Sequence, residues 1–181
     1  TNSARITLGG NINQQTHFRS FHASKGSGTD FLGFDNGFRS LKGGLNAALQ
    51  PTTGGKGIDL LANSLNNDWT VRKYKPWADL NLSADFNRSK DYDNGAVLAL
   101  LASMNYSNSY RTYSPMENSF FGAYDLTHDE SVYLHHNIDN QYNHNTRLGA
   151  MFNLTFVPAK GVGHYEWKNI FNQLSVDRYT S

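Results

Sequence analysis

Apolar and small polar residues alternate with a period of two in five stretches of the chain, and no stretch of comparable length keeps a 3.6-residue period. Alternate side chains point to opposite faces of a β-strand, so this pattern predicts strands. The alternation is weaker in the third stretch, which begins apolar on both faces, and in the fifth, where Ile170 breaks it. The predicted strands, which make the chain all-β, are residues 6–13, 80–87, 96–107, 148–156 and 165–174.

The connections between these strands alternate between short and long. Residues 90–95 end in an Asn-Gly pair that suits a tight turn, and residues 158–164 are equally short and contain two glycines. Residues 14–78 and 108–145 are long connections. Long loops without regular structure are uncommon in compact soluble domains, whereas outer-membrane barrels have short turns on one side and long loops on the other. The connections therefore favour an antiparallel transmembrane β-barrel with two long outer loops.

Two other all-β architectures remain open on the alternation alone. A soluble extracellular β-sandwich, acting as a binding module, would turn the same apolar faces into a core. A small outer-membrane barrel with an adhesive role would need at least eight strands, and the sequence offers five. Five strands leave two unpaired edges in lipid, so we expect this chain to be a fragment of a larger barrel.

Composition excludes several other classes of protein. The chain has 181 residues, no Cys, 13% aromatic residues and a formal net charge of +1. It is therefore not a disulfide scaffold, and disordered chains contain fewer aromatic residues. The charge balance gives no excess of cations for binding nucleic acid. The longest apolar run, residues 96–102, is about a third of the length needed for a membrane-spanning helix.

Several stretches resemble the TonB-dependent outer-membrane receptors that include the SusC-like importers. Residues 30–39 read D-F-L-G-F-D-N-G-F-R and resemble the family loop D-F-L-G-[FY]-D-[DN]-G-x-R. Residues 64–69 read S-L-N-N-D-W and are similar to the family segment S-F-N-N-D-W. The family usually has Pro where this chain has Lys42. Similar barrel strands and loop bases are residues 105–110, 141–145, 147–151 and 168–173.

This resemblance implies that residues 1–181 are part of the barrel domain of such a receptor. Family members enclose a plug domain in a barrel of about 22 strands and engage TonB through an N-terminal motif. Neither the plug nor that motif is recognisable in this sequence. The implied function is TonB-energised uptake of a scarce solute, such as a glycan or a siderophore, across the outer membrane of a Gram-negative bacterium. The implied partners are outer-membrane lipid, the rest of the barrel, the plug and TonB, and a surface lipoprotein is left open.

The expected orientation follows from the alternation and that resemblance. One face of the predicted strands is polar and would line the lumen or touch the plug; it includes Asn81, Asp85, Asn105 and Asn153. The opposite face is apolar and is expected to face lipid; it includes Leu80, Leu82, Phe86, Leu98, Leu100, Leu148, Phe152, Leu154 and Phe156.

No catalytic signature is present, and we predict that the chain is not an enzyme. There is no Cys and no G-x-S-x-G sequence. Residues 91–95 begin like a calcium loop, but Gly95 comes one position too early. Residues 54–57 lack the glycine and hydroxyl positions of a phosphate loop. The His, Asp and Glu residues of the second long connection have irregular spacing, so we predict no metal and no cofactor.

Aromatic residues of the second long connection are the candidate ligand-binding residues. Aromatic faces offer a large apolar contact area to a sugar or another bulky ligand at low entropic cost. Packing of the same rings against the rest of the loop is the more frequent alternative. The candidates are Tyr113, Phe120, Phe121, Tyr124 and Tyr133.

Overall fold

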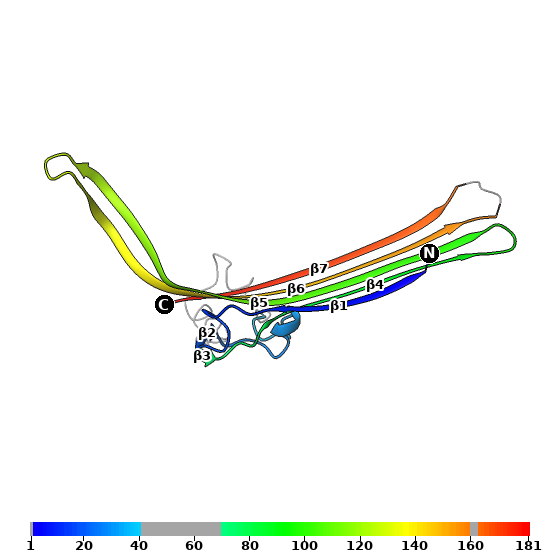
Figure 1. Ribbon diagram of the computed structural model, residues 1–181, viewed down its shortest axis with the longest axis horizontal. Coiled ribbons are helices and arrows are strands. Elements are labelled where there is room, and N and C mark those ends of the chain that lie inside the picture. The colour runs from blue at the N-terminus through cyan, green and yellow to red at the C-terminus, as the bar shows by residue number, and fades with distance from the viewer. Residues whose placement is uncertain (1, 41–69, 160–162) are drawn as a thin grey trace, which may run out of the picture.

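The computed structural model describes residues 2–40, 70–159 and 163–181, and these form an all-β structure (Figure 1). Five antiparallel strands make one sheet in the order β1-β4-β5-β6-β7, and two short strands make a second sheet, β2-β3. The described residues contain no helix that is long and apolar enough to cross a membrane. The strands are β1 (Ser3–Asn11), β2 (Phe21–Ser24), β3 (Val71–Tyr74), β4 (Asp79–Asp91), β5 (Val97–Asp125), β6 (Glu130–Val157) and β7 (Tyr165–Thr180).

All five strands predicted from the alternation are present in the larger sheet. The turn predicted at residues 90–95 is also confirmed: Gly95 N donates to Tyr92 O at 2.8 Å and Tyr92 N donates to Ala96 O at 2.8 Å. Gly95 adopts φ 82°, the left-handed conformation for which glycine is suited. Part of the other predicted turn, residues 160–162, lies outside the described residues.

The register places the nine apolar residues predicted for one face on a single face of the sheet. Leu98 pairs with Phe156, and Leu100 pairs with Leu154, so their side chains point the same way. The polar residues Asn81, Asp85, Asn105 and Asn153 share the opposite face by the same register. The apolar side chains in the central rows of the first face, which we call the apolar band, are Ala4, Ile6, Ala84, Phe86, Leu98, Leu100, Ala102, Met104, Ala150, Phe152, Leu154, Phe156, Trp167 and Phe171. Arg88, Lys90 and Asn169 lie in the same rows.

The connection predicted as an outer loop at residues 108–145 is instead a continuation of β5 and β6. The two strands stay paired to Asp125 and Glu130 and are joined by a turn at residues 126–129. Pairing with β4 ends at Asn108, and pairing with β7 ends at Gln141. Beyond these points the two strands form a projecting hairpin, residues 116–139, which bends away from the sheet after a register shift between Tyr113 and Met116 (Figure 1).

The other long connection also has structure of its own. Residues 12–40 and 70–78, which we call the docked module, contain β2, β3 and a 3₁₀ turn, η1 (Asp30–Leu32). The docked module packs on the face of the sheet that carries the apolar band, beyond one end of that band (Figure 1). Phe21 and Ala23 are buried there, at 1% and 6% exposure. Residues 41–69, including the stretch 64–69 used in the family resemblance, lie outside the described residues.

Candidate functional site

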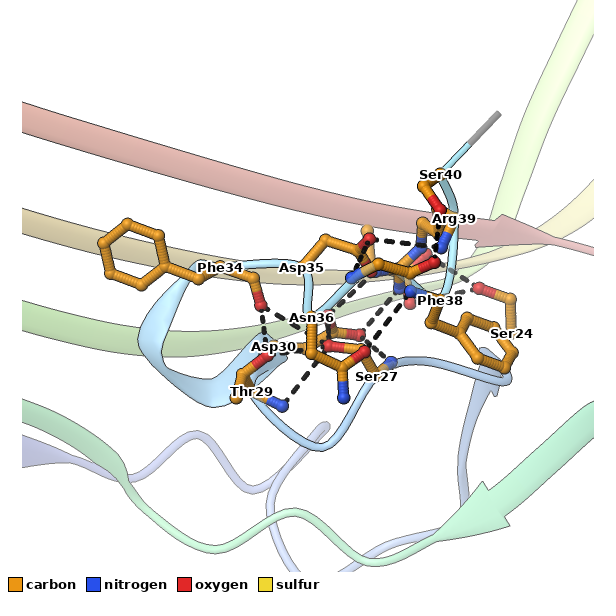
Figure 2. A network of polar contacts seen from close by, with 12 residues as sticks. Ser24, Ser27, Thr29, Asp30, Phe34, Asp35, Asn36, Phe38, Arg39 and Ser40 are labelled. Carbon is orange, nitrogen blue, oxygen red and sulfur yellow. Dashed lines mark hydrogen bonds and ion pairs between the residues drawn. The ribbon is translucent and has the colours of Figure 1, made fainter. Parts of the chain in front are cut away.

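The segment that resembles the receptor family, residues 30–39, folds into a compact loop closed by one arginine. Arg39 donates from Nη1 to Asp30 Oδ1 at 2.8 Å and from Nη2 to Asp30 Oδ2 at 2.7 Å, a bidentate ion pair (Figure 2). Arg39 Nη1 also donates to Asp35 Oδ1 at 3.2 Å. Asp35 Oδ2 accepts from the backbone N–H of Gly37 and of Arg39. Asp30, Asp35, Gly37 and Arg39 therefore form a self-contained network of hydrogen bonds.

The same contacts shift the pKa values of Asp30 and Arg39. Hydrogen bonding to Arg39 holds the pKa of Asp30 below its usual value, and burial opposes this effect. The hydrogen bond from Arg39 to Asp30 correspondingly raises the pKa of Arg39. The Arg39 side chain is 46% exposed, so solvent screens the pair and its contribution to stability is modest. The network mainly fixes the shape of the loop.

Two strands of the sheet hold the loop in place. Tyr106 of β5 donates its hydroxyl to the carbonyl of Phe31. Gln173 of β7 donates from Nε2 to the carbonyl of Gly33 at 2.9 Å. A Cβ atom at Gly33 would lie 3.4 Å from the Gln173 side chain, and the residue has φ 85°, so glycine suits both the close approach and the backbone conformation.

Two cavities lie between the docked module and the sheet, and Asp30 lines both of them. One has a volume of about 300 Å³ and the other about 380 Å³. Both are lined by Asp30, His144 and Asp177. Ser24 Oγ donates to Asp177 Oδ1 at 3.2 Å across the second cavity. Within the described part of the chain, no group of three or more His, Asp and Glu side chains is arranged to hold a metal ion.

His144 is the titratable ring at the floor of both cavities. Its ring stacks on Tyr110 with 4.4 Å between centroids, and its Nε2 lies 2.8 Å from Asn108 Oδ1. Burial lowers the pKa of His144, and the negative charges of Asp177 and Asp30 partly offset that effect. The neutral ring is therefore the form that the folded structure favours.

We expect the docked module to be held less tightly at acidic pH because of His144. The pKa of His144 is higher in the unfolded chain, where it has the ordinary histidine value of 6.5, than in the folded structure. Below that pH protons therefore favour the open state, and the stability that is present above it is lost on acidification. Hydrogen exchange of the β2 backbone at pH 7.5 and 5.5, corrected for intrinsic rates, measures this change. His144→Gln should reduce the pH dependence, whereas His135→Gln on the projecting hairpin should leave it unchanged. An unaltered profile in His144→Gln would assign the pH dependence to other groups.

The aromatic candidates Tyr113, Phe120, Phe121, Tyr124 and Tyr133 do not converge on one point. Tyr113 precedes the bend in β5, while Tyr124 lies next to the hairpin tip, up to about 36 Å further along the strand. Only Phe121 and Tyr133 are in ring contact among the five, with 4.7 Å between centroids. All five are about half exposed, between 49% and 63%. Four of them lie on the projecting hairpin, where the consecutive residues Phe120 and Phe121 point to opposite faces of the strand.

A second aromatic cluster, which the sequence reasoning did not identify as a site, joins the docked module to the sheet. The ring of Phe21 contacts those of Tyr74, Tyr110 and Tyr142 at centroid distances of 5.4 to 5.5 Å. Tyr110 of β5 and Tyr142 of β6 therefore pack beneath Phe21.

A buried histidine and aspartate anchor the start of the docked module. His17 Nδ1 accepts from the backbone N–H of Asn13 at 2.6 Å, which leaves Nε2 to donate to Asp79 Oδ1 at 2.9 Å. The same Asp79 oxygen accepts the backbone N–H of Tyr110 at 2.9 Å. Both side chains are almost fully buried, at 0% and 6% exposure. This arrangement joins the module, β4 and β5 at one point.

Comparisons with known proteins find no similar one. No protein-family model matches the chain. No curated protein and no solved structure matches it either.

Proposed function

We propose that this chain is a wall segment of a TonB-dependent outer-membrane receptor that takes up a scarce solute such as a glycan or a siderophore. The observation that supports this most is the apolar band, which continues across all five adjacent strands on one face. From Leu98 to Tyr106 on β5 this face covers about 26 Å along the strand. At a strand tilt of about 40° its height is about 20 Å, close to the apolar belt of about 25 Å in outer-membrane barrels.

The remaining parts have roles in this proposal that follow from their positions. β1 and β7 are the outer strands of the described sheet and would pair with further strands of the barrel. The docked module and the projecting hairpin lie at the same end of the sheet, opposite the tight turn at Gly95, and would be extracellular. The hairpin aromatics, led by Phe121 and Tyr133, would contact the solute. The plug, TonB and a surface lipoprotein would act as partners, without any catalytic step or cofactor.

A soluble β-sandwich is the main alternative, and the exposure of the band argues against it. In a sandwich the inner face of each sheet is covered by the other sheet. Here Ile6 is 78% exposed and Trp167 is 61% exposed, and the only other sheet in the described residues is the pair β2-β3. Expression of this polypeptide alone in detergent-free buffer tests the point. A folded, monodisperse monomer by circular dichroism and size exclusion would contradict the receptor proposal, and aggregation would support it.

A charge placed on the apolar band should destabilise the inserted protein. Ala102 lies in the middle row between Phe86 and Phe152, so Ala102→Arg is expected to cost about 2 to 4 kcal/mol, as for Arg near the membrane midplane. Ser103 is the adjacent residue on the opposite face, and Ser103→Arg should cost less than about 1 kcal/mol. Urea unfolding of the intact protein in phospholipid vesicles measures both free energies. Equal costs for the two variants would show that the band does not face lipid.

A further inference from the structure

The edge of the docked module nearest the apolar band carries three exposed apolar side chains. Phe31, Leu32 and Phe34 are 54%, 39% and 39% exposed. The ring of Phe34 is stacked on that of Phe171, with 6.0 Å between centroids. Phe171 pairs with Ala150 and belongs to the row of the band closest to the module. The apolar surface of the sheet therefore continues without a polar break onto this edge of the module.

The backbone that carries these side chains is held firmly. The carbonyls of Phe31 and Gly33 accept hydrogen bonds from Tyr106 and Gln173, so the polar backbone atoms face the sheet while the side chains remain outside. In Figure 2 the Phe34 ring points away from the polar network, toward the end where β7 begins. Phe38, in the same loop, lies on the other side of the network, beside Ser24 (Figure 2). The loop thus presents one apolar edge toward the band.

The charges that flank this edge are hydrogen-bonded within the loop, where one guanidinium serves two carboxylates. Phe31, Leu32, Gly33 and Phe34 form an uncharged run between Asp30 and Asp35. Both carboxylates accept hydrogen bonds from the guanidinium of Arg39. A charge that is paired and hydrogen-bonded can approach an apolar phase at a much lower cost than an isolated one. The ion pairs therefore suit a loop that lies at the boundary between lipid and water.

We infer that Phe31, Leu32 and Phe34 form an interfacial anchor, which inserts into the acyl-chain layer of the outer leaflet just below the headgroups. This inference rests on the proposed function, because it requires the apolar band to face lipid. The occupant is the bilayer itself, since the exposed apolar edge is continuous with the surface that lipid would cover. The anchor fixes the height of the docked module above the membrane, and Phe and Leu side chains anchor interfacial segments at the boundary between headgroups and acyl chains.

Spin labels at single introduced cysteines test the anchor separately from the barrel proposal. This chain contains no Cys, so each substitution adds one labelling site to it. The intact protein is reconstituted in dioleoylphosphatidylcholine vesicles, and collision of each label with oxygen, which concentrates in lipid, is compared with collision with a water-soluble nickel chelate. Ala102→Cys reports on the band, Phe31→Cys on the anchor, and Phe38→Cys serves as a matched control in the same loop. Unsubstituted protein taken through the same labelling provides the background signal.

The expected result is a several-fold higher oxygen-to-nickel ratio for Phe31→Cys than for Phe38→Cys, with a still higher ratio for Ala102→Cys. A water-exposed label at Phe31 together with a lipid-exposed label at Ala102 would overturn the anchor and leave the receptor proposal standing. A water-exposed label at Ala102 would overturn the receptor proposal, and the anchor with it. If Phe31→Cys does not fold by circular dichroism, Leu32→Cys takes its place with the same expected ratio.

Discussion

Replacing Asp79 with alanine is expected to weaken attachment of the docked module to the sheet by about 3 kcal/mol. The carboxylate accepts two hydrogen bonds, from His17 Nε2 and from the backbone N–H of Tyr110, each at 2.9 Å. Alanine leaves both donors without their acceptor, and a buried unsatisfied donor costs about 1 to 3 kcal/mol. The His17 side chain is 0% exposed, so water cannot replace the lost contact without opening the module.

Hydrogen exchange of residues 13–24 measures this loss as a rise in local opening. A change of about 3 kcal/mol corresponds to roughly 100-fold faster exchange, provided that exchange is limited by the opening equilibrium. Asp79→Asn retains an oxygen that accepts from both donors and should cost less than about 1 kcal/mol. Asp85→Ala, in the middle of the same strand where Asp85 pairs with Arg5 and Ser103, is a second control. An equal destabilisation of the module in Asp79→Ala and Asp79→Asn would show that the negative charge of Asp79, and not its hydrogen-bond acceptor oxygen, holds the module.

The five strands and their two faces could be predicted because they depend on a local pattern. Leu80, Leu82, Ala84 and Phe86 alternate with polar residues, and a period of two leaves only the choice of which face is buried. The turn at Asn94 and Gly95 was also local, since Gly95 supplies the left-handed conformation that the turn requires. These features involve residues that are close together in sequence.

The length of β5 and β6 could not be predicted from the same pattern. Apolar alternation ends near Tyr106, so it predicts that the strand ends at residue 107. Backbone pairing nevertheless continues to Asp125, because the two strands satisfy each other's N–H and C=O groups whatever the polarity of their side chains. Asn, Ser, Thr and Tyr in this region leave no strong apolar signal. The alternation therefore shows where a face is apolar, and it underestimates the length of strands that continue with polar side chains.

The docked module could not be predicted because its contacts join residues that are far apart in sequence. His17 meets Asp79, Phe21 meets Tyr142, and Ser24 meets Asp177. No spacing along the chain indicates such pairs. The family resemblance did identify residues 30–39 as a distinct loop, but it gave no sign that Arg39 closes the loop or that Gly33 lies against β6 and β7. The aromatic candidates of the projecting hairpin were identified by type, and their role in ligand binding stays a prediction.

Replacing Phe21 with alanine should release the docked module almost completely while the five-stranded sheet persists. Phe21 is 1% exposed and contacts the rings of Tyr74, Tyr110 and Tyr142, so its removal leaves a cavity among three large side chains. Truncation of a buried phenylalanine costs about 3 to 5 kcal/mol. This loss of stability falls on the module because few apolar side chains besides Phe21 are buried there; Ala23 is one of them.

Limited proteolysis and hydrogen exchange distinguish this local release from general unfolding. In Phe21→Ala, β2 and β3 should lose protection, while β4 to β7 should keep theirs, because the sheet is held by its own backbone pairing. Phe120→Ala on the projecting hairpin is the matched control, since that ring is 63% exposed and its loss should cost less than about 0.5 kcal/mol. Loss of protection across β4 to β7 in Phe21→Ala would mean that the module and the sheet fold as one unit. A destabilisation of the module below about 1 kcal/mol would mean that the hydrogen bonds of Asp79 suffice to hold it.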